Sequence, residues 1–189
     1  EMSASLVGSE MCIRDRFEGI KEGKINILFA GRIVEQKGIS VLSAVINKLN
    51  THINTFYFHI VGEGHLKEDL VKELGFFENV HFYGNVYNLA QYLHSFDFLF
   101  MPSVHEGLSM LSIESSFAKL PVIINSCEGL VDTVPNAWPL KVKDNNVDDF
   151  VEVFNNIKNL DRKVLAESAY QFVSDRFGIE QMQNQYIEY

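Results

Sequence analysis

The sequence predicts an α/β domain in which helices cover both faces of a doubly wound, mainly parallel sheet. Three observations predict this fold. Short apolar segments alternate with segments whose apolar residues recur at helical spacing. Glycine follows each of the first five apolar segments, where a chain must turn. Hydrophobic residues make up 47% of the 189 residues, which is enough for one large packed core and argues against a mostly disordered chain.

The expected strands are short, apolar and rich in β-branched and aromatic residues, as in INILFA and TFYFHIV. In chain order they span residues 25–30, 55–61, 80–82, 98–101, 121–125 and 138–142. The expected helices alternate with them and then follow them, at residues 39–49, 66–74, 89–95, 110–119, 147–159, 162–176 and 179–189. Because strands that alternate with helices form right-handed crossovers, the sheet should be mainly parallel.

Charge and cysteine content exclude several classes of protein. The formal net charge of −9 argues against nucleic-acid binding by phosphate neutralisation and against broad adhesion to an anionic membrane. No apolar run reaches the ~20 residues that a spanning helix needs. Two cysteines are too few for a disulfide framework or a cysteine zinc site. We therefore expect a cytoplasmic protein, with peripheral association at the inner membrane face as an alternative.

The N-terminus needs a separate interpretation. Residues 6–16, LVGSEMCIRDR, resemble one reading frame of a transposon-end sequencing adapter over eleven consecutive positions. We interpret residues 1–16 as an assembly artefact and expect them to be disordered; a genuine disordered leader is the alternative. Residues 17–24 are expected to form a short linker, and residues 25–189 to form one domain.

Ligands of open parallel sheets bind beyond the carboxyl ends of the strands, so the residues after each strand are candidate ligand-binding residues. Arg32 and Lys37 follow the first strand, and their planar and compact cations suit a diphosphate, although a solvated loop pair is the alternative. Gly62 and Gly64 follow the second strand. They match a dinucleotide fingerprint only in part, because Lys67 replaces its third glycine, and they favour a tight turn close to a nucleotide.

Two more strand exits add candidates. Gly84 and Asn85 follow the third strand and are also expected near the nucleotide. Glu106 follows the fourth strand, and Glu114 lies about two turns along the next helix. The start of that helix is a potential anion site. Its first expected backbone donors belong to Gly107, Leu108 and Ser109.

The segment PSVHEGLSMLSIESSFAKLPVIINSCEG resembles the signature region of family 4 retaining glycosyltransferases, the group 1 members of the GT-B fold. That pattern has Pro-Ser, then Glu-Gly, a second Glu eight positions on, and Ala-x-x-Pro-Val-Ile. Here its residues are Pro102, Ser103, Glu106, Gly107, Glu114, Ala118, Pro121, Val122 and Ile123. Residues 31–38 are similar to the diphosphate loop of that family, and the resemblance extends over residues 25–189. The chain departs from the family at Ser109, Glu128 and Asp132.

The resemblance implies that the chain is the Rossmann-like, donor-binding half of a GT-B enzyme. Such an enzyme transfers a sugar, with retention, from a nucleotide-diphosphate sugar to a glycan or lipid-linked acceptor, as in polysaccharide biosynthesis. Arg32 and Lys37 would hold the diphosphate, Glu114 the ribose, and Glu106 the donor sugar as the catalytic residue, helped by the amides after Gly107. No metal or other cofactor is expected.

The resemblance also implies a missing N-terminal acceptor domain, through which any membrane contact would occur. We therefore expect this fragment to be inactive alone. The nucleobase, whether of UDP, GDP or ADP, stays open. One alternative is a nucleotide-sugar epimerase-like GT-B domain, which would share the diphosphate site but lack the Glu106 and Glu114 signature. Another is a non-catalytic flavodoxin-like binding module, which would need no convergence of these cations and carboxylates.

Overall fold

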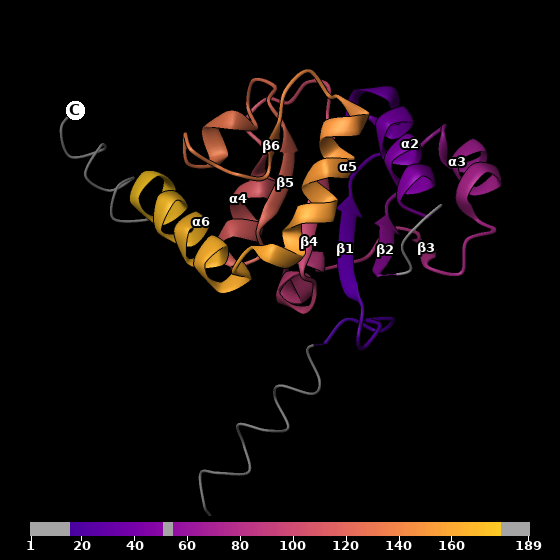
Figure 1. The fold of residues 1–189 in the computed structure, drawn as a ribbon, viewed down its shortest axis with the longest axis horizontal. Coiled ribbons are helices and arrows are strands. Elements are labelled where there is room, and N and C mark those ends of the chain that lie inside the picture. Colours follow the sequence, from indigo (N-terminus) through magenta and orange to yellow (C-terminus); the bar gives the residue numbers. More distant parts are fainter. Residues whose placement is uncertain (1–15, 51–54, 179–189) are drawn as a thin grey trace, which may run out of the picture.

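The structure, a computed structural model, describes residues 16–50 and 55–178. It contains a six-stranded sheet with the order β3-β2-β1-β4-β5-β6, and every neighbouring pair is parallel (Figure 1). The strands are β1 (Ile25–Ala30), β2 (Phe56–Val61), β3 (Val80–Tyr83), β4 (Phe98–Met101), β5 (Val122–Asn125) and β6 (Lys141–Val142). The predicted doubly wound parallel sheet is therefore confirmed.

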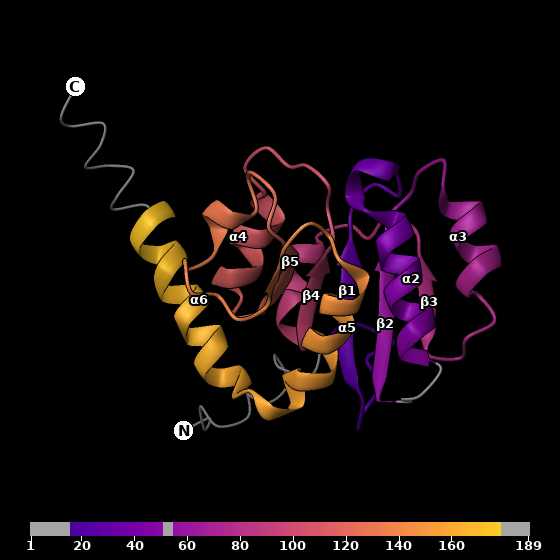
Figure 2. The ribbon, with the colours of Figure 1, turned by 45° about the horizontal axis from the view of Figure 1, so that its top comes forward.

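The helices lie in two layers on either side of the sheet. They are α2 (Ile39–Asn50), α3 (Lys67–Leu74), α4 (Met110–Phe117), α5 (Val147–Asn156) and α6 (Arg162–Phe177). Helix α2 packs beside α3 and α5, and α4 packs beside α6 (Figures 1 and 2). Short 3-10 helices complete the connections: η1 (Glu35–Lys37), η2 (Leu89–Ser95), η3 (Val131–Thr133) and η4 (Ile157–Asn159).

Side-chain caps explain where several helices begin. Asn146 accepts hydrogen bonds from the backbone of Asp148 and Asp149 at the start of α5. Asp161 does the same for the first turn of α6. Each cap satisfies backbone donors that have no partner within the helix. These polar residues therefore fix the helix starts close to where the apolar spacing predicted them.

Four predicted elements differ in detail from the structure. Strand β6 is two residues long rather than residues 138–142, because Trp138 buries its side chain while its backbone forms a turn with Pro135. Helix α4 ends before Lys119, whose φ of 57° is left-handed. The helix predicted at 89–95 is the 3-10 helix η2, and the one predicted at 147–159 changes from α5 to η4.

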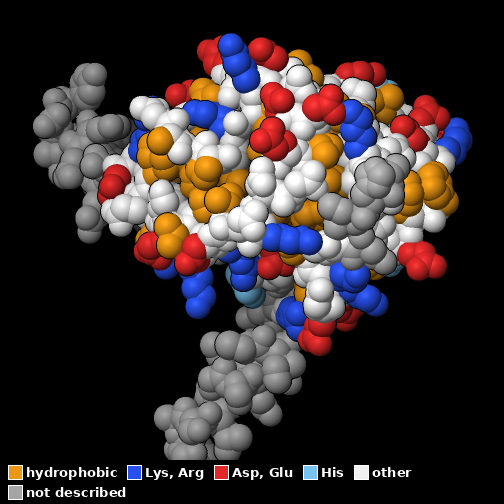
Figure 3. All heavy atoms as spheres, viewed as in Figure 1, with side chains coloured by type: hydrophobic (Ala, Val, Ile, Leu, Met, Phe, Trp, Pro, Cys, Tyr) orange, Lys and Arg blue, Asp and Glu red, His pale blue; other side chains and the backbone are white. Residues whose placement is uncertain are grey.

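The helix predicted at 179–189 lies outside the described residues, as do residues 1–15. Among the described residues, no helix is both long and apolar enough to span a membrane. Figure 3 shows acidic and basic side chains interspersed on the visible face, not gathered into one basic patch.

The segment predicted as a linker packs against the domain at its first residue. Phe17 is 8% exposed, and its ring contacts those of His59, Tyr83 and Phe96. His59 is itself fully buried in β2 and is hydrogen-bonded to Tyr83 and to Asn26 of β1. Burial, together with the charge of a neighbouring histidine, lowers the pKa of His59 to about 4. Phe17 therefore covers a neutral histidine in the core.

Candidate functional site

The order of the strands reverses between β1 and β4, so the connections that leave these two strands diverge at the carboxyl edge of the sheet. Such a reversal is where open α/β sheets form a ligand crevice. The loop after β1 spans residues 31–38, and the loop after β4 spans residues 102–109. These are the two loops that contain Arg32, Lys37 and Glu106.

Backbone contacts join the two loops. The Val104 amide donates a hydrogen bond of 2.9 Å to the Gln36 carbonyl, and the Gln36 side chain donates one of 3.1 Å to the His105 carbonyl. Gly38 has a φ of 69°, and a Cβ there would lie 1.8 Å from the Pro102 carbonyl oxygen. Only glycine allows this approach, so the two loops behave as one unit.

An ion pair crosses between the two loops. Lys37 Nζ lies 2.6 Å from Glu106 Oε1, and the Ser103 hydroxyl donates a hydrogen bond of 2.7 Å to the same oxygen. The side chains of Lys37 and Glu106 are only 19% and 9% exposed. A carboxylate this buried needs a partner, and both donors supply one. The structure thus brings together two of the residues that the sequence predicted for one site.

Two asparagines, one at the end of β5 and one on the loop after β6, hold the backbone next to this pair. The Asn125 side chain donates to the Ser103 carbonyl at 2.9 Å, and the Asn145 side chain donates to the Pro102 carbonyl at 2.7 Å. The backbone amide of Asn145 in turn donates a hydrogen bond of 2.9 Å to the side-chain oxygen of Asn125. The end of β4 is therefore fixed from both β5 and the loop that follows β6.

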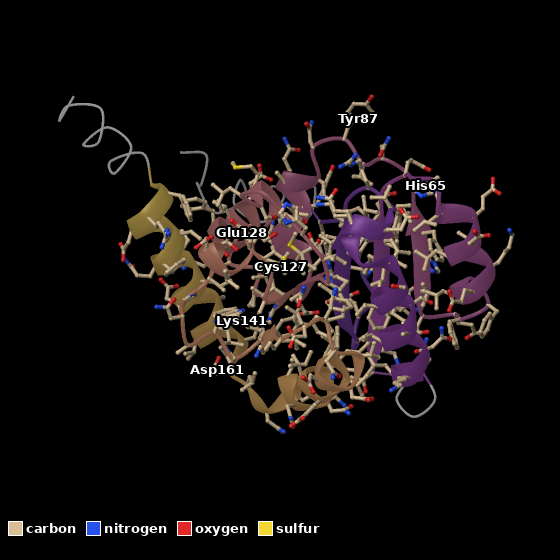
Figure 4. The ribbon with its side chains drawn as sticks, turned by 90° about the horizontal axis from the view of Figure 1, so that it is seen from above. His65, Tyr87, Cys127, Glu128, Lys141 and Asp161 are labelled. Atoms are coloured by element: carbon tan, nitrogen blue, oxygen red, sulfur yellow. The ribbon has the colours of Figure 1, made fainter. Side chains whose placement is uncertain are left out.

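A cavity of about 370 Å³ opens beside Glu106, and we call it the Glu106 cavity. Its walls are His105, Glu106, Gly107, Leu108, Glu128, Gly129 and Asp132. Gly129, with a φ of 81°, brings the loop after β5 against the Gly107 carbonyl. In Figure 4, which looks onto the carboxyl edge of the sheet, Glu128 lies beside Cys127. Burial raises the pKa of the Cys127 thiol, and the charge of Glu106 raises it further.

A second cavity of about 290 Å³, the Arg32 cavity, lies at the ends of β1, β2 and β3. Its walls are Ala30, Gly31, Arg32, Val61, Gly62, Glu63, Asn85, Val86 and Leu89. Arg32 is exposed there, and Asn85 lies on the wall of the same cavity. The Arg32 cavity therefore has one guanidinium and one carboxylate, that of Glu63, on its walls, and the Glu106 cavity has three carboxylates.

Two predicted glycines serve contacts within the protein. A Cβ on Gly62 would lie 1.9 Å from the Gly31 carbonyl oxygen, and one on Gly64 would lie 2.2 Å from the Ile33 carbonyl oxygen. Their small size thus lets the loops after β1 and β2 touch. Gly84 is exposed and would place a Cβ 3.0 Å from the Glu63 carboxylate.

The start of α4 differs from the anion site that was expected. Ser109 is buried and caps the helix, because its hydroxyl accepts a hydrogen bond from the Ser112 amide. One of the first backbone donors is therefore already satisfied. Glu114 is exposed on α4 and is not among the residues lining either cavity. Gly107 and Leu108 do line the Glu106 cavity, in agreement with their expected position near Glu106.

Three groups near Glu106 have no predicted role: Ser103 donates a hydrogen bond to Glu106, and Glu128 and Asp132 line the Glu106 cavity. In the sequence, Ser103 is recognisable only as part of the Pro-Ser motif, and its position three residues before Glu106 is the signal for its role. Glu128 and Asp132 differ from the family pattern, and that difference does not indicate a position on the cavity wall. The walls of a cavity depend on how loops fold back together, and sequence spacing does not define that.

Comparisons with known proteins agree on one family. The sequence model described as "Glycosyl transferases group 1" matches residues 13–172. The chain is 32% identical over 114 residues to the O-antigen biosynthesis glycosyltransferase WbnH of Escherichia coli, a match that covers 60% of the chain and 32% of WbnH. It is 30% identical over 175 residues to the 2-deoxystreptamine glucosyltransferase of Streptomyces kanamyceticus, covering 88% of the chain and 45% of that enzyme. The chain thus spans less than half the length of either relative.

Solved structures share the fold. TarM of S. aureus, in a complex that includes UDP, has a TM-score of 0.76 at 22% identity, covering 90% of this chain and 36% of TarM. HepE of Anabaena, in complex with UDP-glucose, has a TM-score of 0.74 at 16% identity, covering 99% of this chain and 52% of HepE. The C-terminal domain of LpcC, a group 1 protein from Francisella tularensis, has a TM-score of 0.71 at 19% identity, covering 83% of this chain and 88% of that domain.

Proposed function

Because this chain belongs to the group 1 glycosyl transferases, we propose that it is the donor-binding half of a retaining glycosyltransferase. In this proposal the chain binds a nucleotide-diphosphate sugar, and the complete enzyme transfers that sugar to a glycan or lipid-linked acceptor. The O-antigen biosynthesis enzyme among its relatives supports a role in polysaccharide biosynthesis. The structural neighbours whose complexes contain UDP or UDP-glucose support a nucleotide-sugar donor.

One observation gives the strongest support to this function: the ion pair between Lys37 and Glu106 at the point where the strand order reverses. A nucleotide sugar has anionic phosphates between two groups that bear hydroxyls. Lys37 lies on the same loop as Arg32 and pairs with Glu106, which lines the Glu106 cavity. It can therefore serve phosphate while Glu106 accepts a sugar hydroxyl. A cation and a carboxylate in contact therefore match the junction between the phosphate and the sugar.

The proposed chemistry is electrostatic. As the bond between sugar and phosphate breaks, negative charge develops on the β-phosphate, and in this proposal Arg32 and Lys37 stabilise it. No metal has a role in this proposal, because these two cations serve as the phosphate partners. Glu106 would orient the donor sugar through its hydroxyls, and Glu114 would bind the ribose. Glu114 would need to be reached by a ligand that extends along the exposed side of α4.

Two observations support the proposal that the chain is one half of an enzyme: the share of its relatives' length that it covers, and its structural similarity to a solved C-terminal domain. The chain spans 32% and 45% of the two relatives, and it resembles a solved C-terminal domain over 88% of that domain. We expect an N-terminal domain to provide the acceptor site. The chain alone should therefore bind nucleotide but transfer no sugar. Turnover to a defined acceptor by this chain alone would contradict the half-enzyme proposal.

Isothermal calorimetry with UDP, GDP and ADP tests the binding function. We expect one of the three to bind, and the Lys37→Met variant to bind it at least tenfold more weakly, since a charge-assisted bond contributes about 1.5–3 kcal/mol. Lys72→Met is the matched control, because Lys72 forms an exposed ion pair with Asp69 on the surface of α3. If none of the three nucleotides binds, or if both variants lose the same affinity, the proposed function is wrong.

A further inference from the structure

The carboxylate of Glu106 is held asymmetrically. Both hydrogen bonds that it accepts from described residues, from Lys37 and from Ser103, end on Oε1. Glu106 also lines the Glu106 cavity. Oε2 is therefore the oxygen available to a ligand in that cavity. An oxygen in this position can accept a hydroxyl proton without breaking either of the two existing hydrogen bonds.

The two donors differ in how firmly they are held. Lys37 has a long side chain that can rotate, and its ammonium has three donor protons. Ser103 is 1% exposed, and its own carbonyl accepts a hydrogen bond from Asn125. The preceding carbonyl, that of Pro102, is held by Asn145. The serine hydroxyl therefore reaches Glu106 from a backbone that Asn125 and Asn145 fix in place.

A difference in function follows from this difference in rigidity. A diphosphate that binds at the loop after β1 would attract Lys37 and weaken its bond to Glu106. The Ser103 hydroxyl carries no charge, so a phosphate would not attract it, and its residue is buried. It would therefore keep its hydrogen bond to Oε1. We propose that Ser103 is a positioning residue, which holds Glu106 with Oε2 toward the donor sugar while Lys37 serves the phosphate. This inference rests on the proposed function of the site.

Four variants of the 189-residue chain test it. Ser103→Ala removes the donor, Ser103→Cys keeps a similar size with a weak donor, and Ser103→Thr keeps the hydroxyl. Ser43→Ala is the matched control, since Ser43 is also a buried, hydrogen-bonded serine but lies on α2. Each is titrated with the pair that the unmodified chain binds: UDP and UDP-glucose, GDP and GDP-mannose, or ADP and ADP-glucose.

We expect Ser103→Ala to weaken binding of the nucleotide sugar about tenfold and to leave binding of the bare nucleotide within twofold. Ser103→Cys should lose a similar factor, which keeps the test valid if the alanine variant does not fold. Ser103→Thr and Ser43→Ala should bind both ligands as the unmodified chain does. If Ser103 had a purely structural role, its replacement would weaken the binding of the nucleotide and of the nucleotide sugar by the same factor.

Two results would overturn the inference: equal losses for nucleotide and nucleotide sugar in Ser103→Ala and Ser103→Cys, or no loss in either. Glu106→Gln distinguishes this failure from that of the proposed function. If Glu106→Gln weakens only the nucleotide sugar while Ser103→Ala does not, the role of Ser103 is wrong and the function stands. If Glu106→Gln weakens neither ligand, the proposed role of Glu106 is itself wrong.

Discussion

Lys37 and Glu106 lie 69 positions apart in the sequence, and their side chains meet at 2.6 Å. This ion pair joins the loop after β1 to the loop after β4, and both side chains are largely buried. Its effect on stability and its effect on ligand binding have different physical origins, so they can be measured separately.

Removing only the cation of this pair should destabilise the fold. In Lys37→Met, Glu106 keeps a buried charge with Ser103 as its remaining partner, and we expect the free energy of unfolding to fall by about 3 kcal/mol. The double variant Lys37→Met with Glu106→Gln should recover part of this loss, because no buried charge is left without an opposite charge. Urea denaturation at pH 7 measures both. A double variant as unstable as the sum of the two single variants would show that the pair is not coupled.

Two glycines of the site should respond differently to alanine. A Cβ at Gly129 would lie 1.4 Å from the Gly107 carbonyl oxygen, and the φ of 81° is unfavourable for alanine. Gly107 is the control, because nothing lies within 4 Å of its Cβ position. We expect Gly129→Ala to lower the free energy of unfolding by at least about 2 kcal/mol, and Gly107→Ala to change it by less than about 0.5 kcal/mol. Thermal melting of both variants checks this, and similar melting temperatures would contradict it.

The sheet could be predicted from the sequence because its signal is local. Strand β2 is buried along its whole length, and a strand buried on both faces gives a nearly continuous apolar segment in the sequence. Strand β6 was predicted too long for a related reason: Trp138 and Leu140 are buried like strand residues, although the paired backbone spans only Lys141–Val142. Burial sets an apolar pattern, but backbone pairing does not follow from it.

The site was predictable only in part. Lys37 and Glu106 could be assigned to one edge because parallel strands end there together. Their direct contact could not be predicted, because it depends on how Gly38 packs against Pro102. The same holds for the capping role of Ser109 and for the exposure of Glu114, which both follow from where α4 begins.

Phe17 should anchor the segment before β1 to the core. Its ring is buried against His59 and Tyr83, so Phe17→Ala should lower the free energy of unfolding by about 3 kcal/mol. Phe76→Ala is the control, because Phe76 is 69% exposed. Deleting residues 1–16 should leave the melting temperature nearly unchanged. A large fall in melting temperature on that deletion, or no loss of stability in Phe17→Ala, would contradict the anchoring role of Phe17.

The buried His59 should make stability depend on pH. Its pKa is about 4 in the folded chain, against 6.5 for an ordinary histidine, so the unfolded chain binds the proton first as pH falls. The stabilisation is therefore complete above pH 6.5 and is lost between pH 6.5 and 4, by about 2 kcal/mol at pH 5. His59→Gln removes this titration. Urea denaturation measures the free energy of unfolding at pH 7 and at pH 5. Between these two pH values the unmodified chain should lose about 2 kcal/mol more of this free energy than His59→Gln does. Equal losses in the two proteins would refute the prediction.

The most direct test of the proposed function compares Glu106→Gln with Glu114→Gln, each titrated calorimetrically with the nucleotide that binds and with its sugar conjugate. Glu106→Gln should weaken the nucleotide sugar about tenfold. It should leave the bare nucleotide at least as tightly bound, because Lys37 no longer shares its charge with Glu106. Glu114→Gln should weaken both ligands by the same factor, since both contain the ribose. Equal losses of both ligands in both variants, or no loss in either, would contradict the proposal that Glu106 recognises the sugar.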